Sequence, residues 1–145
     1  MIKLYTIGFA QKSAEEFFTM LRKAHVKTLV DVRLNNVSQL AGFTKKNDLQ
    51  FFLREIIGAA YIHVPDLAPT KDILDGYKKK QIKWEQYVRQ YEYLLKTRDL
   101  SSALSKIDLD GACLLCSEPT ADKCHRRLAA EYIQSQNEEI SVLHL

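Results

Sequence analysis

The stretch Thr28-Leu-Val-Asp-Val-Arg33 decides the fold class of this chain. Its apolar residues run together and give way to polar ones only near the end. A strand with one solvated face alternates polar and apolar residues, whereas a parallel strand covered by helices on both faces shows a continuous apolar run. We therefore predict a buried parallel strand over residues 28–33, with Asp31 and Arg33 at its carboxyl end.

Four further segments have the length and residue types of strands. They cover residues 3–9, 60–65, 111–116 and 140–144. Segments with helical spacing lie between them, and strands that alternate with helices form a parallel sheet with helices on both faces. The sequence thus predicts a single three-layer α/β domain over residues 1–145, with a mostly parallel sheet of about five strands.

The predicted helices carry recognisable end signals. Ser13 and Glu16 form a capping box before a helix that reaches residue 24. Asn47 and Gln50 form a second, weaker capping box, and Gly58 stands where the C-terminal cap of that helix would lie. Two more helical segments are expected, a helical insertion at about 70–100 and a helix over 122–136.

Length and composition exclude several classes of protein. The chain has 145 residues, of which 46% are hydrophobic and 27% charged, with only five Gly and three Pro. This composition differs from that of disordered, collagen-like or low-complexity chains, and the length suits one domain. No apolar run approaches the roughly 18 residues of a membrane span, and the first residues lack the apolar core of a signal peptide. We expect no membrane association.

The three cysteines bear on the cellular compartment. Cys113, Cys116 and Cys124 lie close together, and an odd, clustered set is a poor framework for disulfides. We therefore expect reduced thiols and a cytoplasmic protein. Cys113 and Cys116 have C-x-x-C spacing, but strand residues three apart face opposite sides of a sheet. Cys113 is accordingly expected in the core.

Ligands of open parallel sheets bind beyond the carboxyl ends of the strands. Beyond the fourth strand the chain enters the last helix through Cys116-Ser-Glu-Pro-Thr-Ala-Asp-Lys-Cys-His-Arg126. A helix N-terminus attracts anions, and a cysteine beside a histidine and an arginine has a lowered pKa. We interpret Cys116 or Cys124 as a nucleophile and Glu118 or His125 as the group that moves the proton. Alternatively, the cysteines are small buried hydrophobic residues.

The other strand ends add candidates for ligand binding. Asp31 and Arg33 lie on one face of their strand, where they can hold a ligand or form a structural ion pair with each other. The complete set of expected ligand-binding residues is Thr6, Gly8, Asp31, Arg33, Ser38, His63, Lys71 and Arg126.

These residues favour a small enzyme that acts on a phosphate-bearing or other anionic ligand, such as a nucleotide or a nucleic-acid end. The helix N-terminus, Arg33, Lys71 and Arg126 would hold the anion. The residues indicate neither a particular reaction nor a cofactor, and they leave the oligomeric state open.

Two alternatives from other functional classes remain. Residues 71–98 carry a net charge of +4, and Tyr77-Lys-Lys-Lys-Gln-Ile-Lys-Trp84 mixes aromatic rings with lysines. That pattern is typical of a single-strand nucleic-acid surface over residues 77–98, although the rings also fit the inner face of a helix. The third hypothesis is a metal-stabilised interaction domain, in which zinc is held by residues from the set Cys116, Glu118, Cys124, His125 and His63.

Five short motifs carry a family resemblance. They are Thr6-Ile-Gly8, Leu29-Val-Asp-Val-Arg33, Tyr61-Ile-His-Val-Pro65, Leu115-Cys-Ser-Glu118 and Cys124-His-Arg126, the last leading into Leu128-Ala-Ala-Glu-Tyr132. Over essentially the whole chain the sequence resembles the domain-of-unknown-function family 488, and the Cys-x-Glu…Cys-His-Arg element is the specific part. The resemblance implies a compact α/β domain and no established reaction. Members often carry a histidine and a serine where this chain has Phe9 and Ala10, so no role of that pair is expected here.

Overall fold

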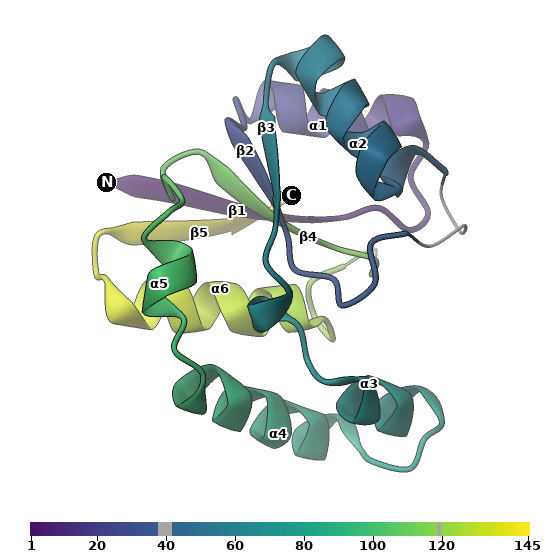
Figure 1. Ribbon diagram of the computed structural model, residues 1–145, viewed down its shortest axis with the longest axis vertical. Helices are drawn as coiled ribbons and strands as arrows, with labels where there is room; N and C mark the ends of the chain where they lie inside the picture. Colours follow the sequence, from purple (N-terminus) through teal and green to yellow (C-terminus); the bar gives the residue numbers. More distant parts are fainter. Residues whose placement is uncertain (38–41, 119) are drawn as a thin grey trace.

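The computed structural model describes residues 1–37, 42–118 and 120–145. A five-stranded sheet lies between two layers of helices (Figure 1), which confirms the predicted three-layer α/β fold. The strands are β1 (Ile2–Gly8), β2 (Thr28–Asp31), β3 (Ala60–His63), β4 (Ala112–Cys116) and β5 (Ile140–His144). All neighbouring strands are parallel, in the order β3-β2-β4-β1-β5.

Helices cover both faces of the sheet. On one face lie α1 (Ala14–Lys23), α2 (Lys46–Phe52) and the π-helical turn η2 (Leu53–Ile57). On the other lie α3 (Lys71–Lys78), α4 (Trp84–Thr97), α5 (Ser101–Leu104) and α6 (His125–Gln136). Two short 3₁₀ turns complete the structure, η1 (Gly42–Thr44) and η3 (Pro65–Leu67).

The central strands explain the continuous apolar runs. Every residue of β4 is buried, because β2 and β1 pair with its two edges and helices cover its two faces. Leu114 and Cys116 belong to the core beneath α4 and α6, whereas Cys113 and Leu115 belong to the core beneath α1 and α2. A strand in this position has no polar face, as the sequence pattern indicated.

The predicted caps are partly confirmed. Ser13 caps α1 and forms the expected capping box with Glu16, and Gly58 ends η2 in the left-handed conformation at φ 68°. The capping box predicted at Asn47 and Gln50 is wrong. The helix begins one residue before Asn47, because the 3₁₀ turn η1 runs directly into it and Lys45 takes the N-cap position without a side-chain bond.

Some element boundaries also differ from the prediction. β2 ends at Asp31 instead of residue 33, because the Asp31 carboxylate accepts a hydrogen bond from the Arg33 backbone N–H. α6 begins at His125 instead of residue 122, because Cys124 N bonds Ala121 O in a turn that precedes the helix. The short helix α5 was not predicted, whereas the helical insertion expected at about 70–100 is present as α3 and α4.

Gly8 marks the place where the loop after β4 crosses the end of β1. A Cβ atom added there would overlap the Glu118 carbonyl oxygen and would lie 2.7 Å from Nη1 of Arg126. The backbone of the loop can approach β1 this closely only because residue 8 has no side chain.

We predict that Gly8→Ala lowers the unfolding free energy by about 1–3 kcal/mol, the usual cost of overpacking. Chemical denaturation of the variant and the wild type measures this difference. Gly42→Ala is the matched control, because nothing lies within 4 Å of its added Cβ. Equal losses in the two variants would show that the crossing at Gly8 is not tight.

Candidate functional site

The alternation of strand residues divides the carboxyl edge of the sheet into two clusters. Thr6, Cys116, Cys124, Arg126 and His144 lie together on the α6 side, and we call them the thiol cluster. A second cluster faces α1 and α2, on the other side of the sheet, and consists of Asp31, Arg33, Thr44 and Tyr61. The candidate residues predicted for one site are therefore divided between two clusters.

The buried guanidinium of Arg126 is the centre of the thiol cluster. Its Nε donates to Thr6 Oγ1 at 3.2 Å, and its Nη1 donates to the Glu118 carbonyl oxygen at 2.6 Å. The same Nη1 lies 3.3 Å from Cys116 Sγ. The side chain is only 1% exposed, and among the described residues no carboxylate lies within salt-bridge distance of it. Arg126 therefore joins β1, β4 and the following loop through neutral acceptors and a sulfur.

The charge of Arg126 acts on its neighbours. Burial lowers the pKa of Lys12, and the Arg126 charge lowers it further against the opposing effect of Glu16. Burial also lowers the pKa of His144, and Arg126 again adds to the effect. Burial and the Arg126 charge thus act in the same direction on both groups.

Cys116 and Cys124 are joined by a disulfide. The expectation that all three cysteines are reduced is therefore wrong for this pair. The loop after β4 folds back, so that the last residue of the strand and the N-cap residue of α6 become neighbours, which the odd number of cysteines could not indicate. Cys113 is the unpaired thiol, fully buried in the core as predicted, and burial raises its pKa.

His125 holds α6 against the sheet. Its Nε2 donates to the Val32 carbonyl oxygen at 2.7 Å, and its ring packs edge-on against Tyr91. Burial lowers the pKa of His125 to about 4, so the ring is neutral at pH 7. Because Nε2 is engaged, the predicted role of His125 in proton transfer would have to use Nδ1.

The neutral state of His125 predicts a pH effect on stability. An unfolded histidine binds a proton near pH 6.5, whereas the folded ring binds it only near pH 4. The contribution of His125 to stability is therefore fully present above pH 6.5 and is lost as the pH falls toward 4. The unfolding free energy should decrease by up to about 1.4 kcal/mol per pH unit in this window.

Chemical denaturation between pH 4 and 8 measures this effect, with His125→Gln as the reference. The glutamine amide can donate to Val32 O but does not titrate near neutral pH. We expect the wild type to lose stability relative to His125→Gln as the pH falls. A constant difference between the two proteins would contradict a neutral buried His125.

The second cluster is built on a bidentate ion pair. Arg33 donates to both carboxylate oxygens of Asp31, at 2.9 and 2.8 Å, and its Nη2 also donates to Thr44 O. The Tyr61 hydroxyl donates to Asp31, and the pKa of Tyr61 is raised by burial and by this bond. His63 Nε2 donates to the Arg33 carbonyl oxygen at 2.7 Å. These bonds are those of a structural ion pair. Nη1 of Arg33, however, is buried and has no hydrogen-bond partner among the described atoms, so it could still bind a ligand.

The remaining predicted residues have simple positions. Lys71 is the exposed first residue of α3, and the Glu118 side chain is exposed on the loop after β4. Ser38 lies outside the described residues. The structure thus brings Thr6, Gly8, Cys116, Cys124 and Arg126 together and leaves Asp31, Arg33, His63 and Lys71 apart from them.

Sequence reasoning missed His144. This residue ends β5, and its Nδ1 lies 2.7 Å from Thr6 Oγ1 because Thr6 and His144 are register partners in the β1–β5 pair. The only signal was a histidine at the carboxyl end of a strand. Its neighbours depend on the strand order, which the sequence does not reveal.

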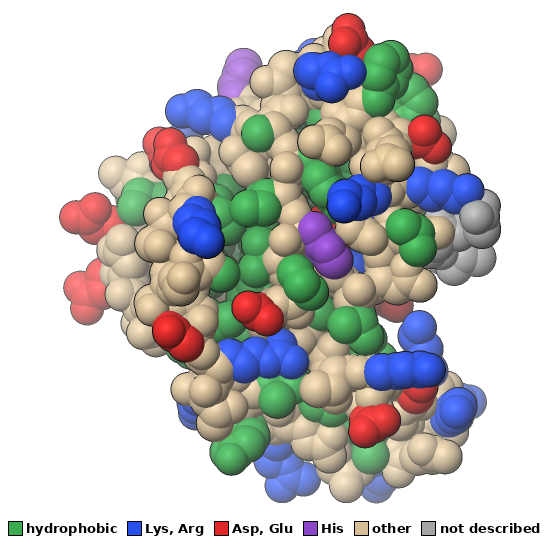
Figure 2. Space-filling view, viewed as in Figure 1, with side chains coloured by type: hydrophobic (Ala, Val, Ile, Leu, Met, Phe, Trp, Pro, Cys, Tyr) green, Lys and Arg blue, Asp and Glu red, His purple; other side chains and the backbone are tan. Residues whose placement is uncertain are grey.

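The aromatic rings of the basic segment point inward. Tyr77, Trp84 and Tyr87 pack against one another with ring centroids 5.0–5.5 Å apart, and Tyr87 is buried. Lys78, Lys79, Lys80 and Lys83 are exposed, and Figure 2 shows Lys and Arg side chains over α3 and α4. The rings expected to stack on nucleic-acid bases therefore pack against the core, where Tyr77 and Trp84 are partly buried, and the lysines face solvent.

The described residues contain neither a metal-ligand cluster nor a helix suited to crossing a membrane. No group of three or more His, Cys, Asp or Glu side chains there is arranged to hold a metal ion. No helix among them has the length and apolar character needed to cross a membrane.

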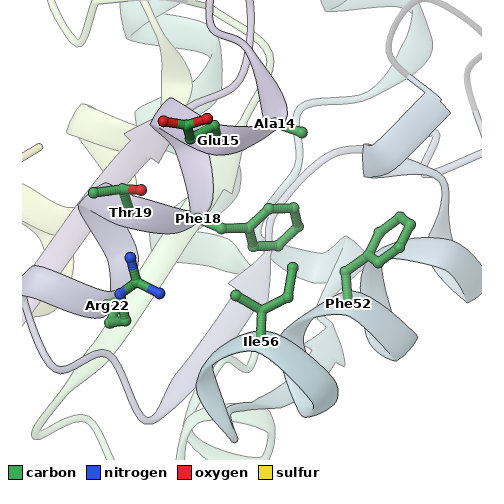
Figure 3. A pocket seen from close by; sticks show the side chains of 7 residues that line it. All are labelled: Ala14, Glu15, Phe18, Thr19, Arg22, Phe52 and Ile56. Carbon is green, nitrogen blue, oxygen red and sulfur yellow. The ribbon is translucent and has the colours of Figure 1, made fainter.

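Two cavities lined by described residues lie away from both clusters. One of about 240 Å³ opens between α1 and the α2–η2 segment (Figure 3), and its lining residues are Ala14, Glu15, Phe18, Thr19, Arg22, Phe52 and Ile56. Another, of about 370 Å³, lies between α3 and α4. Neither is lined by a residue of the thiol cluster.

Comparison with known proteins supports the family resemblance. A family model described as "Domain of unknown function DUF488" matches residues 13–133, a segment that contains most of the sheet and the loop from β4 to α6. The chain belongs to the DUF488 family. A search of curated proteins and a search of solved structures each found no match. Membership in DUF488 assigns no reaction, so the function has to be argued from the site.

Proposed function

We propose that this DUF488 protein is a thiol-dependent enzyme in which a Cys116 thiolate attacks an anionic, phosphate-bearing substrate. The observation that carries the proposal is the 3.3 Å contact between Cys116 Sγ and Nη1 of the buried Arg126. The disulfide with Cys124 is then the oxidised form, and reduction releases the nucleophile.

Charge balance supports the choice of Cys116. A buried cation without an anionic partner is costly, and a thiolate at Cys116 would provide that partner. The guanidinium would in turn stabilise the thiolate over the thiol and lower the pKa of Cys116. Cys113 is fully buried, and burial raises its pKa more than the Arg126 charge lowers it. The site has a second source of positive potential, because Cys124 is the N-cap residue of α6 and the helix dipole favours an anion there.

The electrostatics of the surroundings favour a negatively charged substrate. Burial lowers the pKa of Lys12 and of His144, and the positive charge of Arg126 lowers both further, which supports an anion-binding role for the site. In the proposed step a bond forms between sulfur and phosphorus as the bond to the leaving oxygen breaks. Glu118, exposed on the adjoining loop, is the candidate to protonate that oxygen.

The first test measures the reactivity of Cys116 in the reduced protein. We predict that Arg126→Met slows alkylation of Cys116 by iodoacetamide at pH 7 by about tenfold, the effect of a rise of one unit in thiol pKa. Methionine suits the buried position because apolar replacement of a buried charge is often tolerated. Cys113→Ser is the background for both proteins. An unchanged rate of Cys116 alkylation in Arg126→Met would contradict the proposal.

The second test asks for the substrate class. Inorganic phosphate and a nucleoside monophosphate are expected to protect Cys116 from alkylation, whereas the uncharged nucleoside is not. A variant with Lys78, Lys79, Lys80 and Lys83 changed to Gln should keep this protection. Equal protection by the uncharged nucleoside would contradict an anion site. Salt-sensitive binding of single-stranded nucleic acid that is lost in the lysine variant, without any protection of Cys116, would favour the binding-module alternative.

A further inference from the structure

A chain of three contacts connects His144 to the proposed nucleophile. His144 Nδ1 lies 2.7 Å from Thr6 Oγ1, Thr6 Oγ1 lies 3.2 Å from Arg126 Nε, and Arg126 Nη1 lies 3.3 Å from Cys116 Sγ. The histidine is partly accessible at the end of the edge strand β5, whereas Thr6 is fully buried. This series of contacts therefore extends from solvent at His144 to the sulfur of Cys116.

The chemistry of the groups fixes the direction of the hydrogen bonds. A guanidinium only donates, so Thr6 Oγ1 is the acceptor for Arg126 Nε. The single hydroxyl hydrogen of Thr6 must then point elsewhere, and a buried hydroxyl hydrogen needs an acceptor. Nδ1 of a neutral His144 at 2.7 Å is that acceptor. The remaining ring hydrogen of His144 is therefore on Nε2.

We infer that neutral His144 is a positioning residue of the thiol site, which acts through Thr6 to aim the Arg126 guanidinium at Cys116. The inference rests on the proposed function, because it assigns His144 a part in setting the reactivity of Cys116. By accepting the Thr6 hydroxyl hydrogen, His144 turns the lone pairs of Thr6 Oγ1 toward Arg126 Nε. The guanidinium is then held at one end by Thr6 and keeps Nη1 against the sulfur.

Protonation of His144 would reverse this arrangement. Nδ1 would become a donor, and the Thr6 hydroxyl hydrogen would lose its acceptor. The charged groups that act on His144 are Arg126, Arg127 and Glu131 on α6, and Asp122 in the loop before it. The two arginines oppose protonation of His144 and the two carboxylates favour it. Acidification, which protonates the ring, would therefore break the series of contacts between His144 and Cys116.

The test is the pH profile of Cys116 alkylation by iodoacetamide in the reduced protein, between pH 5 and 9. At pH 7, His144→Ala and Thr6→Val should each slow the reaction by about 2–10-fold, the factor that corresponds to one net hydrogen bond. His144→Gln should stay within about twofold of the wild type, because its amide oxygen can accept from Thr6 but does not titrate. As the pH falls through the acidic part of this range, the wild type should become slower than His144→Gln, because only the wild type can be protonated at residue 144.

A matched control is His25→Asn, a change of an exposed histidine with positive φ to a residue that tolerates this conformation. It should leave the profile unchanged. A wild-type rate in His144→Ala, or a loss in His144→Gln equal to that in His144→Ala, would overturn the inference.

One measurement uses only the wild-type protein, so its result does not depend on whether a variant folds. Nitrogen NMR of the His144 ring at pH 7 should show the proton on Nε2, and a proton on Nδ1 would refute the inference. Failure of the proposed function looks different, because Arg126→Met would then leave Cys116 reactivity unchanged. If Arg126→Met slows alkylation and His144→Ala does not, only the role of His144 fails.

Discussion

The structure of the site depends on one buried cation. The Arg126 guanidinium reaches from the first turn of α6 to Thr6 on β1, to Cys116 on β4 and to the backbone of the loop between β4 and α6. Gly8 leaves room for that loop to cross β1. Because β1 and β4 are neighbours at the centre of the sheet, a single side chain can organise the carboxyl edge of both. The absence of a carboxylate partner among the described residues makes this cation available to a thiolate or an anion.

The layers of the fold follow from short-range patterns that can be read in the chain. Continuous apolar runs such as Ala112–Cys116 identify strands covered on both faces, and the capping box at Ser13 identifies the start of a helix. Strand order has no such local signal, since it depends on which apolar faces pack best in three dimensions. The pairing of Thr6 with His144, and hence the inclusion of His144 in the site, therefore became visible only in the structure.

The candidate site was predicted in part for the same reason. The carboxyl-edge rule collected residues at the ends of the strands, and Cys116, Cys124 and Arg126 do lie together. The rule does not say which face a residue occupies. Asp31 and Arg33 lie on the other face of the sheet and form a separate ion pair beneath the α1 and α2 layer. The pairing of the two cysteines depends on how the loop after β4 folds back, which residue spacing alone does not determine.

The most direct test of the account is the pKa of Cys116 in the reduced protein. Carbon NMR of protein labelled at the cysteine Cβ can follow Cys113, Cys116 and Cys124 separately. The account predicts a Cys116 pKa at least about one unit below the usual 8.5, and a return toward that value in Arg126→Met. A Cys116 pKa at or above 8.5 in the wild type would contradict the claim that Arg126 prepares this thiol for chemistry.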